Sequence, residues 1–232
     1  MKYIVGIDEV GRGPLAGPVT VCVVACEENL YKKLKRDKSL PPPGKDSKKL
    51  SPELRQKYAK NITKIIQGMP LDKFSCVIIN VSNKVIDKKG ISFAISGAIE
   101  KGLRNLKIKI LFENPDVSAL TQGRGVDRSV DFGGPTKTSA LKILLDGGLR
   151  APKEFINQKT IIKGDEKEKI ISWASILAKV SRDNLMCRLA KKYPKYGFEI
   201  HKGYGTEKHR KAIKRWGLSG VHRKSFCRRY DY

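Results

Sequence analysis

The sequence predicts a mixed α/β protein: a five-stranded mixed sheet flanked by helices, followed by a small helical segment at the C-terminus. Three observations predict it. Apolar runs of strand length come first, and runs with helical spacing are then mixed among them. Glycine- and proline-rich turns separate these runs. The chain has 232 residues, enough for one well-buried domain but short for two.

The strands are expected from short apolar runs, and the helices from apolar spacing and end signals. Ser51 followed by Pro52, for example, reads as an N-cap and a first helical residue. We expect strands over residues 2–7, 19–26, 74–81, 141–146 and 158–162, with residues 107–112 as a candidate for a further short one. We expect helices over residues 52–68, 91–106, 170–189 and 207–216.

The domain organisation follows from the same pattern. We expect a catalytic domain over residues 1–190 and a basic, helical C-terminal segment over residues 191–232 that contributes to substrate binding. Residues 113–139 are polar, rich in glycine and without clear periodicity, and we expect residues 107–139 to form an insertion or mobile loop. This stretch carries no expected catalytic role.

Composition restricts the partners and the compartment. The chain has 48 lysines and arginines against 23 acids, a formal net charge of +25, which favours a polyanion such as nucleic acid. Its five cysteines are scattered and form no Cys-x-x-Cys pair, which argues against a disulfide framework and a zinc site. No membrane span or signal peptide is expected, so we predict a cytoplasmic protein.

Acidic residues stand at the ends of three expected strands. Asp8 and Glu9 follow the first, Asp146 ends the fourth, and Asp165 lies just beyond the fifth. Carboxylates gathered at one edge of a sheet repel one another unless cations neutralise them, and oxygen-only ligands favour Mg²⁺ or Mn²⁺. Two such ions can activate water and stabilise a leaving oxygen at a phosphodiester. Taken singly, each of these acids is more often a turn or capping residue.

Several motifs resemble the signatures of type 2 ribonuclease H, the ribonuclease HII family, in family order from residue 4 to residue 226. They include the glycine-rich segment Gly6 to Pro18, Asp46 to Ser51, Lys163 to Asp165, Ala174 to Asp183, Tyr196 to Phe198, His201 to Thr206 and His222 to Phe226. The resemblance implies a ribonuclease H-like fold and a two-metal site formed by Asp8, Glu9, Asp146 and Asp165. Asp183 competes as an acid, but its motif places it on a helix beside Arg182, where a helix-stabilising ion pair is the better role. Asp116, Asp127 and Asp131 compete with Asp146, yet none follows an apolar strand.

The resemblance also implies how substrate is bound. Main-chain groups of Gly11, Arg12 and Gly13 would sense the 2′-hydroxyl of a ribonucleotide, and Tyr204 would pack on the next sugar. Phosphate contacts are expected from Lys48, Lys49 and Lys179, whereas Ser47 and Ser175 are either phosphate ligands or an N-cap and a core hydroxyl. The substrates would be RNA/DNA hybrids and duplex DNA with embedded ribonucleotides, cut on the 5′ side of the ribonucleotide to leave 3′-hydroxyl and 5′-phosphate ends, as in ribonucleotide excision repair.

Three alternatives stay open. Ribonuclease HIII shares the fold but carries an additional N-terminal domain, whereas here the strand with Asp8 and Glu9 begins almost at residue 1. A binding protein without catalysis should have lost one of the four acids, and another metal-dependent nuclease or integrase should lack Gly11 to Gly13 and Tyr204. We expect a monomer, and a sliding clamp as partner is left open. Trp173, where the family usually has a small residue, predicts a locally rearranged core.

Overall fold

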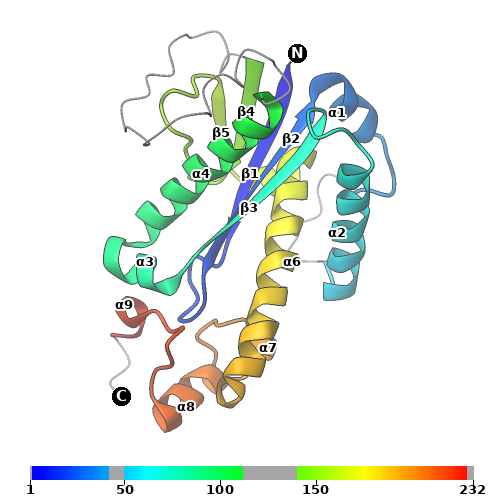
Figure 1. The fold of residues 1–232 in the computed structure, drawn as a ribbon. Coiled ribbons are helices and arrows are strands. Elements are labelled where there is room, and N and C mark those ends of the chain that lie inside the picture. Colours follow the sequence, from blue (N-terminus) through cyan, green and yellow to red (C-terminus); the bar gives the residue numbers. More distant parts are fainter. Residues whose placement is uncertain (1, 42–49, 112–139, 229–232) are drawn as a thin grey trace, which may run out of the picture.

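A five-stranded sheet forms the centre of the computed structural model, which describes residues 2–41, 50–111 and 140–228 (Figure 1). The strands are β1 (Tyr3–Val10), β2 (Val19–Glu27), β3 (Phe74–Val81), β4 (Leu141–Asp146) and β5 (Gln158–Ile161). Their order across the sheet is β3-β2-β1-β4-β5. The pairs β1/β2 and β2/β3 are antiparallel, and β1/β4 and β4/β5 are parallel. The predicted mixed sheet is therefore confirmed.

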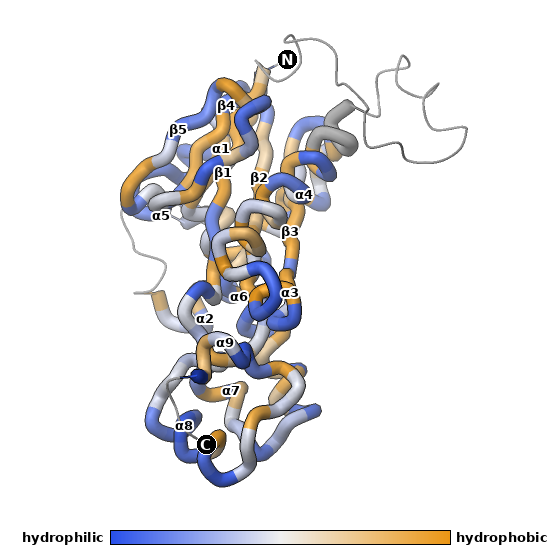
Figure 2. Tube along the Cα trace, turned by 90° about the vertical axis from the view of Figure 1, so that its left-hand side faces the viewer, coloured by the Kyte–Doolittle hydropathy of each residue, from blue (hydrophilic) through white to orange (hydrophobic). Residues whose placement is uncertain are grey.

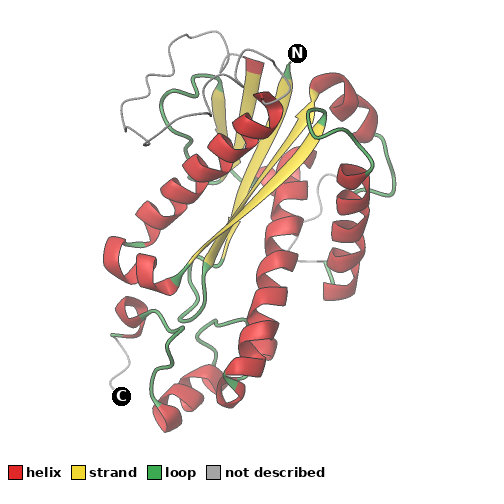
Figure 3. Cartoon of the chain, in the orientation of Figure 1, coloured by secondary structure: helices red, strands yellow, loops and turns green. Residues whose placement is uncertain are grey.

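Helices lie on both faces of the sheet and beyond one end of it (Figure 3). They are α1 (Glu28–Leu34), α2 (Pro52–Gln67), α3 (Asn83–Lys89), α4 (Ile91–Leu111), α5 (Gly164–Lys167), α6 (Lys169–Lys192), α7 (Phe198–His201), α8 (Glu207–Trp216) and α9 (Lys224–Cys227), with the 3-10 turn η3 (Pro194–Tyr196). The α2 start is confirmed, since the Ser51 hydroxyl accepts the amide of Leu54 at 3.3 Å.

Two apolar layers bury the faces of the sheet. Alternate residues of β2, such as Val21 and Val23, pack with α4 on one side, while Cys22 and Val24 pack with α6, α1 and α2 on the other. Helix α6 lies very close to β1, and Gly6 permits this approach, since a Cβ there would overlap the carbonyl oxygen of Ile170. This close approach sets the side chains of α6 directly over the strand that carries Asp8.

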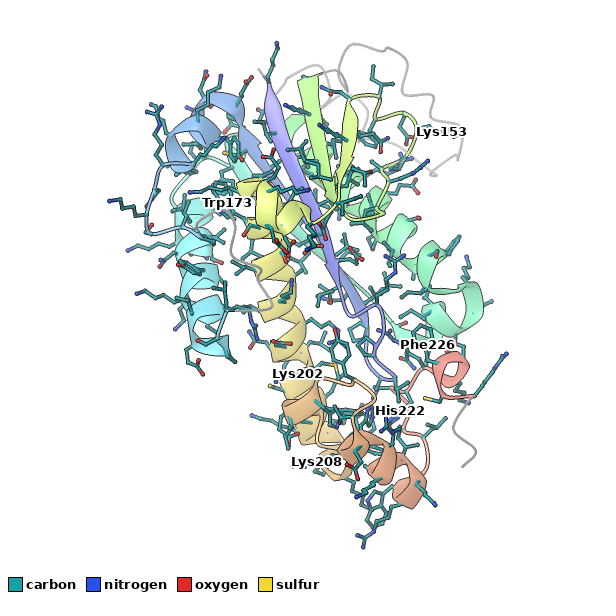
Figure 4. All side chains as sticks on the ribbon, turned by 180° about the vertical axis from the view of Figure 1, so that it is seen from behind. Lys153, Trp173, Lys202, Lys208, His222 and Phe226 are labelled. Atoms are coloured by element: carbon teal, nitrogen blue, oxygen red, sulfur yellow. The ribbon has the colours of Figure 1, made fainter. Side chains whose placement is uncertain are left out.

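Trp173 is fully buried in the layer between α6 and the sheet (Figure 4). Its ring meets that of Tyr31 edge-on at 5.7 Å and lies 5.8 Å from that of Phe74. Within the described ranges of the chain, its indole Nε1 has no hydrogen-bond partner. The large ring is therefore accommodated by aromatic neighbours from α1 and β3, at the cost of one unsatisfied donor.

Some expected elements differ from the structure. Residues 107–111 continue α4 and form no strand, because extending an existing helix adds a hydrogen bond per residue without a new nucleus. The helices α1 and α3 were not anticipated. Strand β1 also extends through Val10, so Asp8 and Glu9 lie within it. The expected insertion at residues 107–139, with the competing acids, falls from residue 112 onward outside the described residues.

Residues 193–228, here called the C-terminal unit, form a third apolar cluster with the end of α6. Leu15 and Ala16, from the turn after β1, also belong to this cluster. Figure 2 shows the hydrophilic course of α8 along the outside of the unit. The unit therefore packs directly on the segment that follows Asp8 and Glu9. The domain boundary at residue 190 stays a prediction, and α6 continues past it to Lys192.

Candidate active site

The register of the parallel strands brings two carboxylates together. Pairing of β1 with β4 runs from Tyr3↔Leu141 to Ile7↔Leu145, so Asp8 and Asp146 follow as the next residues of neighbouring strands. On its other side β1 stays paired with β2, where Asp8 faces Cys22. The two acids thus lie where the parallel pairing of β1 and β4 ends while the antiparallel pairing continues.

Asp8 is buried against α6, with 3% of its surface exposed. Its Oδ2 lies 3.9 Å from Nζ of Lys179, and its carboxyl group is hydrogen-bonded to the side chain of Ser175. Lys179 also donates to Oγ of Ser175 at 2.5 Å. Burial raises the pKa of Asp8 to about 7; Lys179 opposes this, whereas the charges of Glu9 and Asp146 add to it.

Glu9 faces a different partner. Its Oε1 accepts from Nη1 of Arg12 at 3.0 Å, which is an ion pair between the strand and the glycine-rich turn. Burial raises the pKa of Glu9, Arg12 lowers it, and the charge of Asp146 raises it further. Glu9 and Asp8 therefore both lie within electrostatic range of Asp146.

Asp146 and Asp165 are connected through Gly164. Oδ1 of Asp146 accepts the Gly164 amide at 2.5 Å, and a Cβ at Gly164 would meet Cδ1 of Ile171, so any larger residue would require that side chain to shift. Asp165 is the next residue, at the start of α5, with 8% of its surface exposed. The chain thus places Asp165 directly after the residue that binds Asp146.

The donor chemistry of this region suits a hard cation. Carboxylate oxygens are the ligands that Mg²⁺ and Mn²⁺ prefer, and a nearby cation would favour the charged forms of Asp8 and Glu9, whose pKa values are raised chiefly by burial and further by neighbouring acids. Among the residues that the structure describes, no group of three or more His, Cys, Asp and Glu side chains is arranged to hold a metal ion. Rotation of the side chains would therefore be needed for several of these acids to bind one ion.

Residues 11–18, here called the glycine loop, connect β1 to β2. Gly11 has φ +87°, and a Cβ there would overlap the Arg182 side chain, so its conformation and its surroundings both require glycine. Gly13 differs: its φ is not positive, and a Cβ would meet no atom of the described chain within 4 Å. Nothing inside the described protein accounts for a glycine at position 13, which is consistent with close approach by an external ligand.

Tyr204 lies next to this loop. The carbonyl of Gly203 accepts the amides of Leu15 at 2.8 Å and Ala16 at 3.3 Å, which fixes the neighbouring tyrosine against the loop. Its side chain is half exposed, and the Arg182 guanidinium lies 5.8 Å from its ring. Gly11 to Gly13 and Tyr204 are thus held together although about 190 residues separate them.

The remaining predicted residues divide into three groups. Ser175 is fully buried and bonds Asp8 and Lys179, and a contact with phosphate stays a prediction. Ser47, Lys48 and Lys49 lie outside the described residues. Asp183 forms an ion pair with Arg55 at 3.9 Å, whereas the hydrogen bonds of Arg182 go to backbone carbonyls. The expected ion pair of Asp183 exists, but with a residue of α2.

The sequence does not predict that Arg182 and Arg223, the buried arginines behind the glycine loop, bind the backbone of that loop; it places Arg182 only beside Asp183 on a helix. Both are fully buried and donate to carbonyls of the loop. Their positions inside the Ser-Arg-Asp and His-Arg-Lys motifs were the available signal, but a motif does not say which backbone a side chain reaches.

Comparison with solved structures places this sheet and its flanking helices in the ribonuclease H-like class. The chain matches the ribonuclease HII from Archaeoglobus fulgidus, solved as a complex with PCNA, with TM-score 0.57, 24% identity and coverage of 96% of this chain and 94% of that one. It also matches Bst-RNase HIII in complex with Mn²⁺, with TM-score 0.56, 16% identity and coverage of 93% and 63%. These similarities establish the fold.

The sequence narrows the class to one family. The ribonuclease HII family model matches residues 5–231, and the ribonuclease HII of Caldicellulosiruptor bescii is 35% identical over 98% of this chain and 87% of its own length. The chain belongs to the ribonuclease HII family. It is accordingly a ribonuclease H, an endonuclease that hydrolyses RNA in RNA/DNA hybrids. No helix in the described part of the chain is both long enough and apolar enough to cross a membrane.

Proposed function

We propose that this ribonuclease cleaves duplex DNA at single embedded ribonucleotides as well as RNA/DNA hybrids, on the 5′ side of the ribonucleotide, leaving 3′-hydroxyl and 5′-phosphate ends. The observation that carries the proposal is the continuity between β1 and the glycine loop. Asp8 and Glu9 are followed after one residue by Gly11, so the acidic groups and the proposed sugar-binding backbone lie on one short segment.

The proposed metal ligands are Asp8, Glu9, Asp146 and Asp165, and the proposed ions are Mg²⁺ or Mn²⁺. Bound divalent ions would supply charge stabilisation and a more acidic water at the scissile phosphate. Oxygen-only donors, the raised pKa values of Asp8 and Glu9, and the Mn²⁺ complex of a protein with this fold all support this choice. Lys179 would balance the charge of Asp8 and contact phosphate.

Recognition is assigned to backbone and ring surfaces. Main-chain groups of Gly11, Arg12 and Gly13 would meet the ribonucleotide and sense its 2′-hydroxyl, the group that distinguishes RNA from DNA. The open space around Gly13 supports this assignment. The half-exposed ring of Tyr204 would pack on the sugar of the following nucleotide, where a deoxyribose is preferred.

Phosphate contacts from Lys48, Lys49 and the basic C-terminal unit would hold the duplex without reading its sequence. The net charge of +25 supports such contacts. A sliding clamp as partner, a monomeric state and a cytoplasmic location stay predictions.

A cleavage assay tests the proposal. The protein is incubated with Mg²⁺ or Mn²⁺ and three labelled duplexes of one sequence: DNA with a single ribonucleotide, all DNA, and an RNA/DNA hybrid. We expect cleavage of the first and third, and a product from the first that comigrates with a 3′-hydroxyl marker ending one nucleotide before the ribonucleotide. Equal cleavage of the all-DNA duplex, or an intact single-ribonucleotide duplex, would contradict the proposal.

A further inference from the structure

Two fully buried arginines, Arg182 and Arg223, stand behind the glycine loop. A buried guanidinium is costly unless its N–H groups are hydrogen-bonded. Arg182 donates from Nε to the carbonyl of Pro18 at 3.0 Å and from Nη2 to that of Ala16 at 3.3 Å. The hydrogen bonds of both guanidinium groups go to backbone carbonyls of one loop, so both positive charges are buried to hold a main-chain shape.

Arg223 binds both ends of the loop at once. Its Nη2 donates to the carbonyl of Gly11 at 2.7 Å, its Nη1 to that of Arg12 at 3.0 Å, and its Nε to that of Gly17 at 2.9 Å. Three acceptors in different directions suit the planar fork of arginine, whereas lysine offers its donors from one nitrogen.

The bonds of Arg223 also decide where the loop amides point. In a planar trans peptide, the C=O of one residue and the N–H of the next point in opposite directions. The carbonyls of Gly11 and Arg12 are turned toward Arg223, so the N–H groups of Arg12 and Gly13 point away from it. These are amides of the segment proposed to meet the ribonucleotide, and the space around Gly13 is open on the described chain.

The segment that carries Arg223 is itself fixed. Its amide donates to the carbonyl of Leu15 at 2.8 Å, and the amide of Gly17 donates to the carbonyl of Val221 at 2.9 Å. From α3, Nδ2 of Asn83 donates to the carbonyls of Gly220 at 3.1 Å and His222 at 2.9 Å. The guanidinium of Arg223 is therefore anchored from two sides.

We propose that Arg223, supported by Arg182, is a positioning residue that orients the amides of Arg12 and Gly13 and thereby sets the preference for a ribonucleotide over a deoxyribonucleotide. This inference rests on the proposed function. Arg223 acts only through the loop backbone and does not touch the substrate.

The test compares Arg223→Lys with a matched control, Arg104→Lys, on the exposed surface of α4. Both are made in the Asp8→Asn background, so that binding is measured without cleavage. Fluorescence anisotropy gives the affinity for a DNA duplex with one ribonucleotide and for the same duplex in all-DNA form. We expect Arg223→Lys to lower the ratio of ribonucleotide-duplex affinity to all-DNA affinity about tenfold, which is the effect of one or two lost hydrogen bonds. Its affinity for the all-DNA duplex should not change. Arg104→Lys should leave the ratio unchanged.

The outcomes separate the two proposals. If the parent prefers the ribonucleotide duplex and Arg223→Lys keeps that preference, the positioning role is wrong and the proposed function stands. If the parent has no preference, the proposed recognition fails and the inference fails with it. Equal loss of binding to both duplexes would show a general structural role and overturn the inference.

A second variant covers the case in which Arg223→Lys does not fold, as judged by circular dichroism and thermal unfolding. Asn83→Ala removes the two bonds from α3 to the carbonyls of Gly220 and His222 but leaves the guanidinium in place. We expect a smaller fall in the same affinity ratio. An unchanged ratio in a folded Asn83→Ala protein would count against anchoring of the loop through this segment.

Discussion

The carboxylates near the ends of β1 and β4, here called the sheet edge, lie next to the glycine loop, but the two regions are held in place by different interactions. Asp8 and Asp146 are placed by the hydrogen-bonded ladders of regular strands, which do not depend on either side chain. The loop is placed by side chains that reach its backbone from residues 164 to 212 positions away. Side-chain changes at the sheet edge should therefore affect chemistry and leave the fold intact, whereas changes behind the loop should affect its shape.

The largest expected effect tests the sheet edge. Asp8→Asn or Asp146→Asn should lower the cleavage rate by more than about a hundredfold, because each would lose the charge of a proposed metal ligand next to the scissile phosphate. Asp183→Asn, whose ion pair lies with Arg55, is the matched control and should retain cleavage. Single-turnover rates on the single-ribonucleotide duplex measure this. Full activity of the Asp146→Asn variant would show that Asp146 is not part of the active site.

Asp8→Asn should also stabilise the metal-free protein at neutral pH. The folded pKa of Asp8, about 7, lies above the ordinary value of 3.8, so the wild type loses stability as the pH rises through this range. The asparagine variant does not lose stability in this way, because its side chain does not ionise. Thermal unfolding in EDTA should give it the higher melting temperature at pH 8 and a vanishing advantage near pH 4; a lower melting temperature at pH 8 would contradict the buried charge.

Gly11→Ala and Gly13→Ala form a matched pair within the loop. Gly11→Ala should cost roughly 1–3 kcal/mol of folding free energy, since alanine is strained at positive φ and meets Arg182. Gly13→Ala should change stability by less than about 0.5 kcal/mol but weaken binding of the ribonucleotide duplex. Urea unfolding and anisotropy separate the two effects. Equal stability losses would show that Gly13 also has an internal role.

Lowering the pH should destabilise the C-terminal unit, whereas protonation of Asp8 at low pH should favour the folded state. Burial lowers the pKa of His209 and of His222 to about 4, and their Nε2 atoms lie 3.0 Å apart (His222 is labelled in Figure 4). Unfolded histidine binds its proton near pH 6.5, so stability is lost as the pH falls from about 6.5 toward 4. Emission of the half-exposed Trp216 should report this loss. Equal stability of the unit at pH 7 and pH 4.5 would contradict the conclusion that His209 and His222 are buried in their neutral forms.

The smallest expected effect concerns the outer surface of the C-terminal unit. The ring of Trp216 is half exposed, with Lys195 Nζ 4.3 Å and Arg215 Cζ 4.7 Å from its centroid. Trp216→Ala should weaken duplex binding a few-fold, mainly at low salt, if this surface contacts phosphates. Phe93 on α4, half exposed with Lys89 over its ring, is the control. Identical behaviour of both variants would leave α8 without a part in binding.

Much of the molecule could be predicted from local pattern. Strands β1 to β5 follow apolar runs, and the cap at Ser51 follows the residue types at a helix start. The acids at the strand ends and the glycines of the loop could be named because their chemistry depends on residue type and neighbouring sequence. By contrast, the strand considered for residues 107–112 does not form at residues 107–111, because the helix before them continues to Leu111.

The strands of the sheet, the acids near their ends and the glycine loop follow from the sequence alone, because hydrophobic periodicity and turn chemistry act over a few residues. Folding in three dimensions is what pairs Asp183 with Arg55, brings α6 against β1 at Gly6, and places Arg182 and Arg223 against the loop. These contacts join residues far apart in the chain. The buried arginines bind backbone carbonyls, which every residue has, and Asp183 has many basic side chains to choose from, so only the folded arrangement could select the partners.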